Sequence, residues 1–272
     1  MKRKSFKRGF FILAALMFFQ TPSMAALNSQ DILNLSQQME RKAYQYAQQQ
    51  GAKIVPTKDG RSFVLEWLPP GFDVTKDPVL VSLHGHGGCA TRDFQVWHKH
   101  LAKKGFAFVG IQWWYGRSME SIGYAKPRDI YPWIEEALTD LGVPRGRVIF
   151  EGFSMGSANS YAVTYLDRKQ PTPYFGVTIS NSGQLEEDFP PNQLFLGAPG
   201  GHPFTGAHWI IYCGEKDPQH GCGPMGETKT KLEGMGATID KFIQDPSGDH
   251  GGFMKDAQCE PALDLAKEIV SR

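Results

Sequence analysis

The chain has 272 residues, with 29 Lys or Arg and 28 Asp or Glu, so its formal net charge is +1. Nothing in this balance resembles the strong basic excess of nucleic-acid-binding proteins, and we expect no nucleic-acid partner. A chain of this length with 41% hydrophobic residues can build one ordinary core, and no second folded domain is required.

The first 25 residues have the pattern of a secretory signal peptide. Basic residues come first, an apolar run covers 9–19, and Ser23-Met24-Ala25 has the small-x-small form of a cleavage site. The run is about 11 residues long, whereas a bilayer requires about 20, so we expect export without stable membrane insertion, with a membrane anchor as the alternative. Cleavage after Ala25 would remove five basic residues and change the formal net charge from +1 to −4: Lys2, Arg3, Lys4, Lys7 and Arg8.

Residues 26–272 are predicted to form one catalytic domain in which strand and helix patterns alternate. In chain order, a helix at 29–50 with Ser29 as its N-cap is followed by a hairpin of strands at 52–57 and 61–69. Six further strands are predicted at 78–85, 106–113, 147–153, 175–183, 208–217 and 237–245. Between and after them come helices at 91–105, 128–142, 154–169, 227–236 and 256–272.

This alternation predicts an α/β fold with about eight mostly parallel strands and helices on both faces of the sheet. The one long loop rich in Pro and Gly is 185–206, and no long helical insertion interrupts the pattern. We therefore expect no large cap domain over the carboxyl edge of the sheet.

The pentapeptide GFSMG, residues 152–156, lies between a predicted strand and a predicted helix. A sharp turn at such a junction is the nucleophile elbow of G-x-S-x-G hydrolases, in which glycines leave room for close packing. The helix N-terminus that follows favours negative charge. The position predicts Ser154 as a nucleophile, and the alternative is a serine that only caps the helix.

A serine hydroxyl needs a base to take its proton, and the base needs a carboxylate to orient it. His250 lies in the Gly-rich loop SGDHGGF between the last strand and the last helix and is the predicted base, whereas His98 and His100 are assigned to exposed helix positions. Asp217 ends a strand and gives the chain order Ser, Asp, His. It is the predicted acid, and its competitors are Glu215, Asp245 and Asp249.

Two backbone N–H groups are needed to stabilise the oxyanion of an acyl-transfer reaction. Met155 follows the nucleophile and supplies one. The glycine-rich loop LHGHGG, residues 83–88, follows a buried strand and supplies the other, from His86 or alternatively Gly87. A metal-binding His pair is the alternative for this loop, but the sequence has no third ligand at a spacing typical of metal sites. We expect neither a metal nor an organic cofactor.

Three aromatic residues follow the strand at 106–113, at the predicted carboxyl edge of the sheet: Trp113, Trp114 and Tyr115. They are predicted to line a substrate pocket, with loop anchoring as the alternative. Without a cap domain the cleft would be open, which suits an extended or polymeric ester.

The four cysteines of an exported chain predict one or two disulfides, and at least one of the four is a candidate buried thiol. Cys213 and Cys222 flank Asp217, and Cys222 or Cys259 is a candidate link from this acid loop to the loop of His250. Their spacing, and that of Cys89, does not fit a zinc site, and the connectivity stays open.

The HGHGG loop, GFSMG, the Asp217 loop and the His250 loop resemble, in order and spacing, the α/β-hydrolase superfamily over nearly all of residues 26–272. Within it, the leader, HGHGGC and GVPRGRVIFEGFSMGSAN are similar to secreted polyhydroxyalkanoate depolymerases and feruloyl-esterase-like proteins. The resemblance implies a secreted or periplasmic serine esterase that acts on small-molecule or polymeric esters. The alternatives are a secreted serine peptidase with the same triad and a non-catalytic binding protein on this scaffold.

Overall fold

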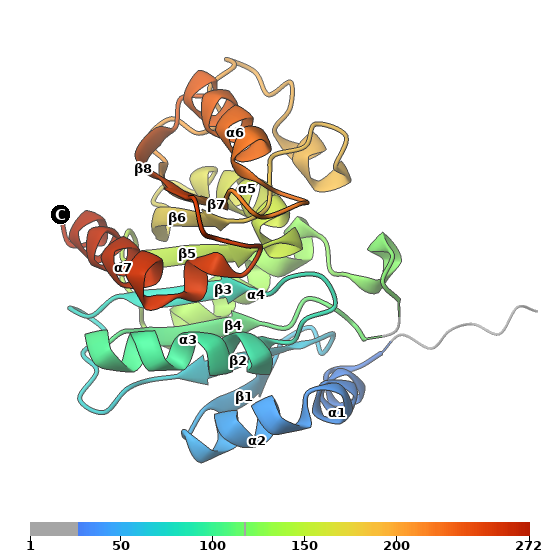
Figure 1. Cartoon of the computed structure of the whole chain (residues 1–272). Helices are drawn as coiled ribbons and strands as arrows, with labels where there is room; N and C mark the ends of the chain where they lie inside the picture. Colours follow the sequence, from blue (N-terminus) through green and yellow to red (C-terminus); the bar gives the residue numbers. More distant parts are fainter. Residues whose placement is uncertain (1–26, 117) are drawn as a thin grey trace, which may run out of the picture.

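An eight-stranded sheet organises the chain in the computed structural model, which describes residues 27–116 and 118–272 (Figure 1). The predicted signal peptide at 1–25 lies outside these residues. The strand order is β1-β2-β4-β3-β5-β6-β7-β8, with β1, β2 and β4 antiparallel and every pairing from β4 to β8 parallel. This confirms the predicted eight-stranded, mostly parallel sheet. The strands are β1 Lys53–Pro56, β2 Phe63–Trp67, β3 Val79–Leu83, β4 Ala107–Ile111, β5 Val148–Phe153, β6 Phe175–Asn181, β7 His208–Gly214 and β8 Thr238–Asp245.

Helices cover both faces of the sheet, as predicted. Successive side chains of β3 point to opposite faces, so Leu80 packs in a cluster with side chains of α3 and α7, while Val79 and Val81 pack in a cluster with those of α4. A third cluster joins α5 and α6 to β7. The helices are α1 Ser29–Met39, α2 Arg41–Gln49, α3 Ala90–Lys104, α4 Pro127–Asp140, α5 Met155–Arg168, α6 Cys222–Gly234 and α7 Asp256–Val270.

The first predicted helix is in fact two helices, which is a correction to the sequence analysis. The chain leaves helical geometry at Glu40, with φ −124° and ψ 48°, between α1 and α2. The N-cap is Asn28 and not Ser29, because the Asn28 side chain accepts from the N–H of Asp31 and the Asp31 carboxylate accepts from the N–H of Asn28. This reciprocal capping box satisfies two N–H groups at once, which Ser29 does not do.

Secondary structure differs from the prediction in two segments, the start of α6 and the connection between β6 and β7. Helix α6 begins at Cys222, five residues before the predicted start, and Pro224 fits there because the first turn of a helix needs no N–H from proline. The Pro/Gly-rich segment between β6 and β7 contains a single 3₁₀ helix, Pro190–Leu194. Among the described residues, no helix is long and apolar enough to cross a membrane.

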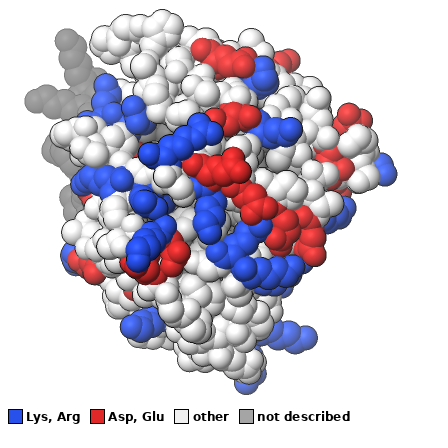
Figure 2. Space-filling view, turned by 90° about the vertical axis from the view of Figure 1, so that its left-hand side faces the viewer, with Lys and Arg blue, Asp and Glu red and all other residues white. Residues whose placement is uncertain are grey.

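Charged side chains of both signs lie close together on the surface drawn in Figure 2, and no large area of that face has a single sign. Ion pairs between α3 and α7 follow this arrangement, for example Lys103 to Glu260 at 3.5 Å and Lys104 to Asp264 at 2.5 Å. Exposed pairs of this kind contribute about 0–1 kcal/mol each.

The carboxyl ends of the parallel strands meet at one edge of the sheet, where open α/β sheets bind their ligands. Leu83 at the end of β3 is paired with Gly152 in β5, so the HGHGG loop begins beside GFSMG. The loops after β7 and β8 reach the same edge, because Gly214 is paired with Asp245. The register therefore brings the four motif-bearing loops together.

Candidate active site

Ser154 occupies a strained turn between β5 and α5. Its backbone has φ 54° and ψ −119°, and it is one of two non-glycine residues with positive φ in the described part of the chain. Such a conformation costs about 1–3 kcal/mol and persists only where the surroundings enforce it. A Cβ at Gly152 would overlap the carbonyl oxygen of Gly156, and a Cβ at Gly156 would overlap that of Leu83. Both glycines of the motif are therefore needed for the turn to pack.

His250 and Asp217 form a hydrogen-bonded pair, with 2.7 Å between Nδ1 of His250 and Oδ2 of Asp217. The other oxygen of Asp217 accepts from the N–H groups of Gln219 at 2.9 Å and His220 at 3.1 Å. Burial raises the pKa of Asp217, but the hydrogen bonds from His250, Gln219 and His220 outweigh it and leave the pKa below its ordinary value. A carboxylate that accepts at Nδ1 keeps the proton on this nitrogen and leaves Nε2 with a lone pair.

Two of the three competing carboxylates, Asp245 and Asp249, have other hydrogen-bond partners. Asp245 accepts hydrogen bonds from Ser247 and from the Tyr212 hydroxyl. Asp249 accepts from the N–H of Gly251. Of the four carboxylates considered from the sequence, only Asp217 forms a hydrogen bond with His250 among the described residues.

Ser154 and His250 line one cavity of about 540 Å³. The His250 ring lies 5.0 Å from the ring of Phe153 and 5.5 Å from that of His220, measured between centroids. Within the described chain, no hydrogen bond joins the Ser154 hydroxyl to the His250 ring. Catalytic hydrogen bonds are often long before substrate binds and shorten in the complex, so the shared cavity is the relevant placement.

The HGHGG loop lies directly against the elbow, since a Cβ at Gly85 would be 3.3 Å from Cβ of Ser154. The N–H of Gly87 already donates to the Tyr124 hydroxyl at 2.8 Å. The N–H of His86 has no acceptor in the described residues, while the His86 ring donates to the carbonyl oxygen of Met119 and stacks on Tyr124. The N–H of Met155 opens α5 and has no partner within that helix. Of the two alternatives in this loop, His86 therefore has the available N–H.

The sequence matches no model of a known protein family and no curated protein. Solved structures do match. The esterase LipW from Mycobacterium marinum is 17% identical with a TM-score of 0.61, over 88% of this chain and 89% of that one. A hyperthermophilic esterase from Pyrobaculum calidifontis is 13% identical with a TM-score of 0.61, over 88% and 93%. The acylaminoacyl peptidase of Pyrococcus horikoshii is 15% identical with a TM-score of 0.57, over 81% and 41%.

The chain has the α/β-hydrolase fold. This confirms the predicted fold class. At such identities the likeness carries the fold and not the substrate. The finer resemblance to polyhydroxyalkanoate depolymerases and feruloyl-esterase-like proteins stays a prediction.

A second cavity of the α/β-hydrolase fold, about 660 Å³, adjoins the elbow at Met155. Its lining is largely apolar, with Lys126 and Arg128 as its basic residues. Of the three aromatic residues predicted to line a pocket, Trp113 lies in this lining. Trp114 is buried and donates its indole N–H to the Ser118 carbonyl oxygen, and the Tyr115 hydroxyl accepts from Arg61, so the structure places these two away from both cavities. Lining side chains that the sequence did not single out include Tyr124, Phe189, Pro190, Pro191 and Leu194.

A disulfide between Cys213 and Cys222 closes the loop that carries Asp217, from the end of β7 to the start of α6. The prediction of a disulfide is confirmed, and so is that of a buried thiol, because Cys89 and Cys259 are both free and buried. The suggested link from the acid loop to the His250 loop is wrong. The bridge is local, and Cys259 lies on the buried face of α7, in a core cluster.

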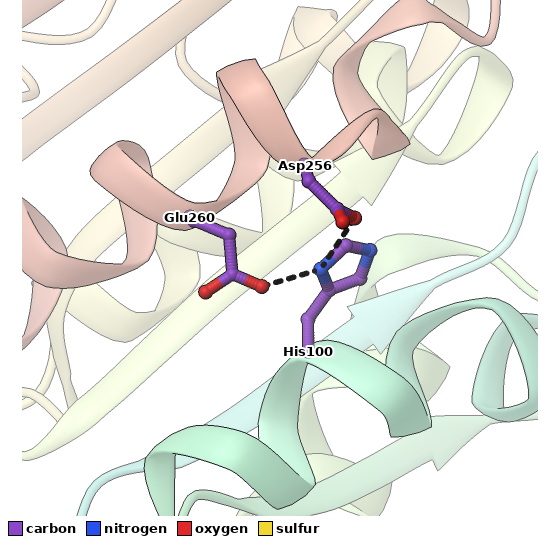
Figure 3. A group of neighbouring side chains, drawn as sticks. All are labelled: His100, Asp256 and Glu260. Atoms are coloured by element: carbon purple, nitrogen blue, oxygen red, sulfur yellow. Dashed lines mark hydrogen bonds and ion pairs between the residues drawn. The ribbon is translucent and has the colours of Figure 1, made fainter.

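His100 forms the one group of potential metal ligands found in the described chain, together with Asp256 and Glu260 (Figure 3). Its side chain is fully buried, which corrects the exposed position predicted from the helix pattern. Nδ1 faces Glu260 at 3.0 Å and Nε2 faces the Met254 carbonyl oxygen at 3.2 Å, so both ring nitrogens already have a partner within the described residues. The carboxylates also pair with lysines of α3, namely Lys99, Lys103 and Lys104. We interpret the cluster as an ion-pair network that joins α3 to α7.

Proposed function

We propose that the chain is an exported serine hydrolase that cleaves carboxylic esters, with Ser154 as nucleophile, His250 as general base and acid, and Asp217 as the acid that orients it. The hydrogen bond of 2.7 Å between His250 and Asp217, in a cavity that both Ser154 and His250 line, is the observation that supports this most. Export is proposed from the leader at 1–25, and the disulfide is compatible with an oxidising compartment.

The reaction begins with attack of Ser154 Oγ on the ester carbonyl carbon, while Nε2 of His250 takes the hydroxyl proton. The carbonyl oxygen becomes an oxyanion, which the N–H groups of Met155 and His86 stabilise. The protonated His250 then gives its proton to the alcohol oxygen as the carbon–oxygen bond breaks. A water molecule, deprotonated by His250, releases the acid from Ser154, and the enzyme returns to its starting state.

Asp217 contributes by holding the imidazole in one tautomer and stabilising its positive charge. Its two other hydrogen bonds come from backbone N–H groups, so the carboxylate is fixed without a mobile partner. Its low pKa keeps it ionised across the pH range in which the imidazole works. Replacement by Asn would keep the shape and favour the wrong tautomer, and a loss of about 10⁴-fold in kcat is expected.

Labelling with a fluorophosphonate tests the nucleophile, and hydrolysis of p-nitrophenyl butyrate tests the reaction. The Ser154→Ala protein should show neither, while Ser271→Ala, which changes an exposed serine at the C-terminus, should retain both. Labelling at another residue, or hydrolysis that survives in Ser154→Ala, would contradict the proposed nucleophile. A folded wild-type protein that is not labelled would favour the binding-protein alternative.

Esters and amides share this chemistry, so the choice of ester requires its own measurement. A panel of esters with graded acyl length, feruloyl esters, polyester film and peptides, each with Ser154→Ala as control, separates an esterase from a peptidase. Of the three predicted aromatic residues, Trp113 lines a cavity and remains the proposed substrate-binding residue, whereas Trp114 and Tyr115 line neither cavity.

A further inference from the structure

The cavity at Ser154 has a polar floor that the triad does not use. Four side chains contribute to it besides the catalytic ones: His84, Asp93, Glu151 and Asn181. Three of them, His84, Glu151 and Asn181, are at most 1% exposed. His84 directly follows β3, Asp93 lies in the first turn of α3, and the other two residues lie near the carboxyl ends of β5 and β6, at the same edge of the sheet. Asp93 and Glu151 could not be singled out from the sequence, because they look like ordinary charged residues of a helix and a strand.

Asp93 and Glu151 share a proton through Ser82. Oγ of Ser82 lies 2.6 Å from Oδ2 of Asp93 and 2.9 Å from Oε2 of Glu151. A hydroxyl has one proton and can donate to one carboxylate only, so the other carboxyl must itself be protonated and donate to Oγ. Burial raises the pKa of both carboxyl groups above the ordinary value, which agrees with a retained proton.

Two further atoms of the floor are acceptors without a donor. Nδ1 of His84 donates to the Gly85 carbonyl oxygen at 2.9 Å, so Nε2 carries a lone pair, and burial lowers the pKa of His84 to about 4, which keeps the ring neutral near pH 7. Asn181 uses its amide N–H₂ on Glu151 at 3.2 Å. Nε2 of His84 and Oδ1 of Asn181 are buried, and neither has a hydrogen-bond partner within the described residues. A buried acceptor without a partner destabilises the folded protein until a donor reaches it.

We infer that this floor binds hydroxyl groups on the alcohol portion of the substrate, so that the natural substrates are esters of hydroxyl-rich alcohols such as glycerol or a sugar. The inference rests on the proposed ester hydrolysis. Nε2 of His84 and Oδ1 of Asn181 accept hydrogen bonds from the substrate hydroxyls, and His84, Asn181, Asp93 and Glu151 are the specificity-determining residues.

The placement of His250 assigns the alcohol to this cavity and not to the other. The leaving alcohol must receive its proton from His250, which lines the 540 Å³ cavity and not the 660 Å³ one. The second, largely apolar cavity at Met155 then holds the acyl group. Hydroxyls fit the polar floor better than an ammonium group, because Arg92 lines the same cavity and His250 becomes positively charged during the reaction.

Three butyrate esters test the inference on the wild-type protein: 1-glyceryl butyrate, propyl butyrate and 2-(dimethylammonio)ethyl butyrate. We expect kcat/KM for the glyceryl ester to exceed that for the propyl ester by about tenfold, the effect of one or two hydrogen bonds that the propyl ester cannot make. Equal values for these two esters would overturn the inference. The highest value for the ammonium ester would overturn the choice of hydroxyls.

Variants test whether the preference for the glyceryl ester depends on the floor of the cavity. Asn181→Leu removes an acceptor in the floor, and the ratio of kcat/KM for glyceryl over propyl ester should fall about 3- to 10-fold, mainly through KM. The matched control is Asn192→Leu, which removes another buried amide with an unpartnered Oδ1, outside the lining of both cavities, and should leave the ratio unchanged. Should Asn181→Leu not fold, Asp93→Asn changes the floor at a partly exposed position and should also lower the ratio. A ratio unaffected by a folded floor variant would refute the assignment.

Fluorophosphonate labelling of Ser154 distinguishes failure of the hydroxyl-binding floor from failure of the proposed serine hydrolase function. A labelled protein that hydrolyses glyceryl and propyl esters equally refutes the hydroxyl-binding floor and leaves the proposed function intact. A folded protein that is neither labelled nor active on any ester refutes the proposed function, and the inference with it.

Discussion

Ser154→Gly is expected to stabilise the protein while it abolishes activity. The φ of 54° and ψ of −119° at Ser154 cost about 1–3 kcal/mol for a residue with a side chain, and glycine adopts them freely. Glycine loses about 0.5–1 kcal/mol through the greater freedom of its unfolded chain. No hydrogen bond of the Ser154 hydroxyl is lost among the described residues, so the net gain is about 1 kcal/mol. Ser154→Ala keeps the strain and should have nearly the stability of the wild type.

Thermal unfolding and urea denaturation of the two variants measure this difference. For a chain of this size, 1 kcal/mol corresponds to about 2–4 °C in Tm, so Ser154→Gly should unfold at a temperature higher than Ser154→Ala by about this amount. The control is Ala158→Gly in the interior of α5, where glycine should cost about 1 kcal/mol. A Tm for Ser154→Gly equal to or below that of Ser154→Ala would show that the elbow stores no strain.

Three further predictions concern stability. Gly156→Ala should lower the urea midpoint by the equivalent of about 1–3 kcal/mol, because its Cβ would overlap a carbonyl oxygen, whereas Gly226→Ala, in an open position of α6, should raise it by about 1 kcal/mol. Burial raises the pKa of Glu151, so the folded chain holds a proton that the unfolded chain releases above the ordinary carboxyl range. The free energy of unfolding should therefore fall as pH rises through this range. Glu151→Gln should reduce this pH dependence in urea titrations between pH 5 and 9. Replacing Cys213 and Cys222 together by Ala should lower the Tm by about 5–10 °C, since a loop of this length contributes about 2.5 kcal/mol, and an unchanged Tm would show that the bridge does not restrict the unfolded chain.

The carboxyl that contacts His250 is one feature that the sequence narrowed but could not settle. Glu215, Asp217, Asp245 and Asp249 all lie near the ends of the last two strands, and adjacency along the chain does not reveal which side chain faces the ring. Asp217 and His250 are 33 positions apart in the sequence, and the pairing of β7 with β8 brings their loops together. A contact distant in sequence likewise distinguishes the N–H groups of His86 and Gly87, because that of Gly87 donates to the Tyr124 hydroxyl.

By itself, the sequence determined the order of strands and helices, the elbow at GFSMG with its two required glycines, and the loop that carries His250. These features depend on local rules: buried runs for parallel strands, conformations that only glycine allows, and the turn between a strand and the helix after it. Even locally there were limits, because the capping box at Asn28 and the break at Glu40 overrode an unbroken helical period.

The partners of individual side chains, by contrast, depend on the tertiary fold. Burial of His100 against α7, the local bridge between Cys213 and Cys222, and the carboxyl pair of Asp93 and Glu151 all join residues from different elements. Ser82 and Glu151 are 69 residues apart and meet because β3 and β5 are neighbours in the sheet. The physical reason is that strand register, set by the whole core, fixes which distant side chains share a low-dielectric space, and a pattern along the chain contains no record of that register.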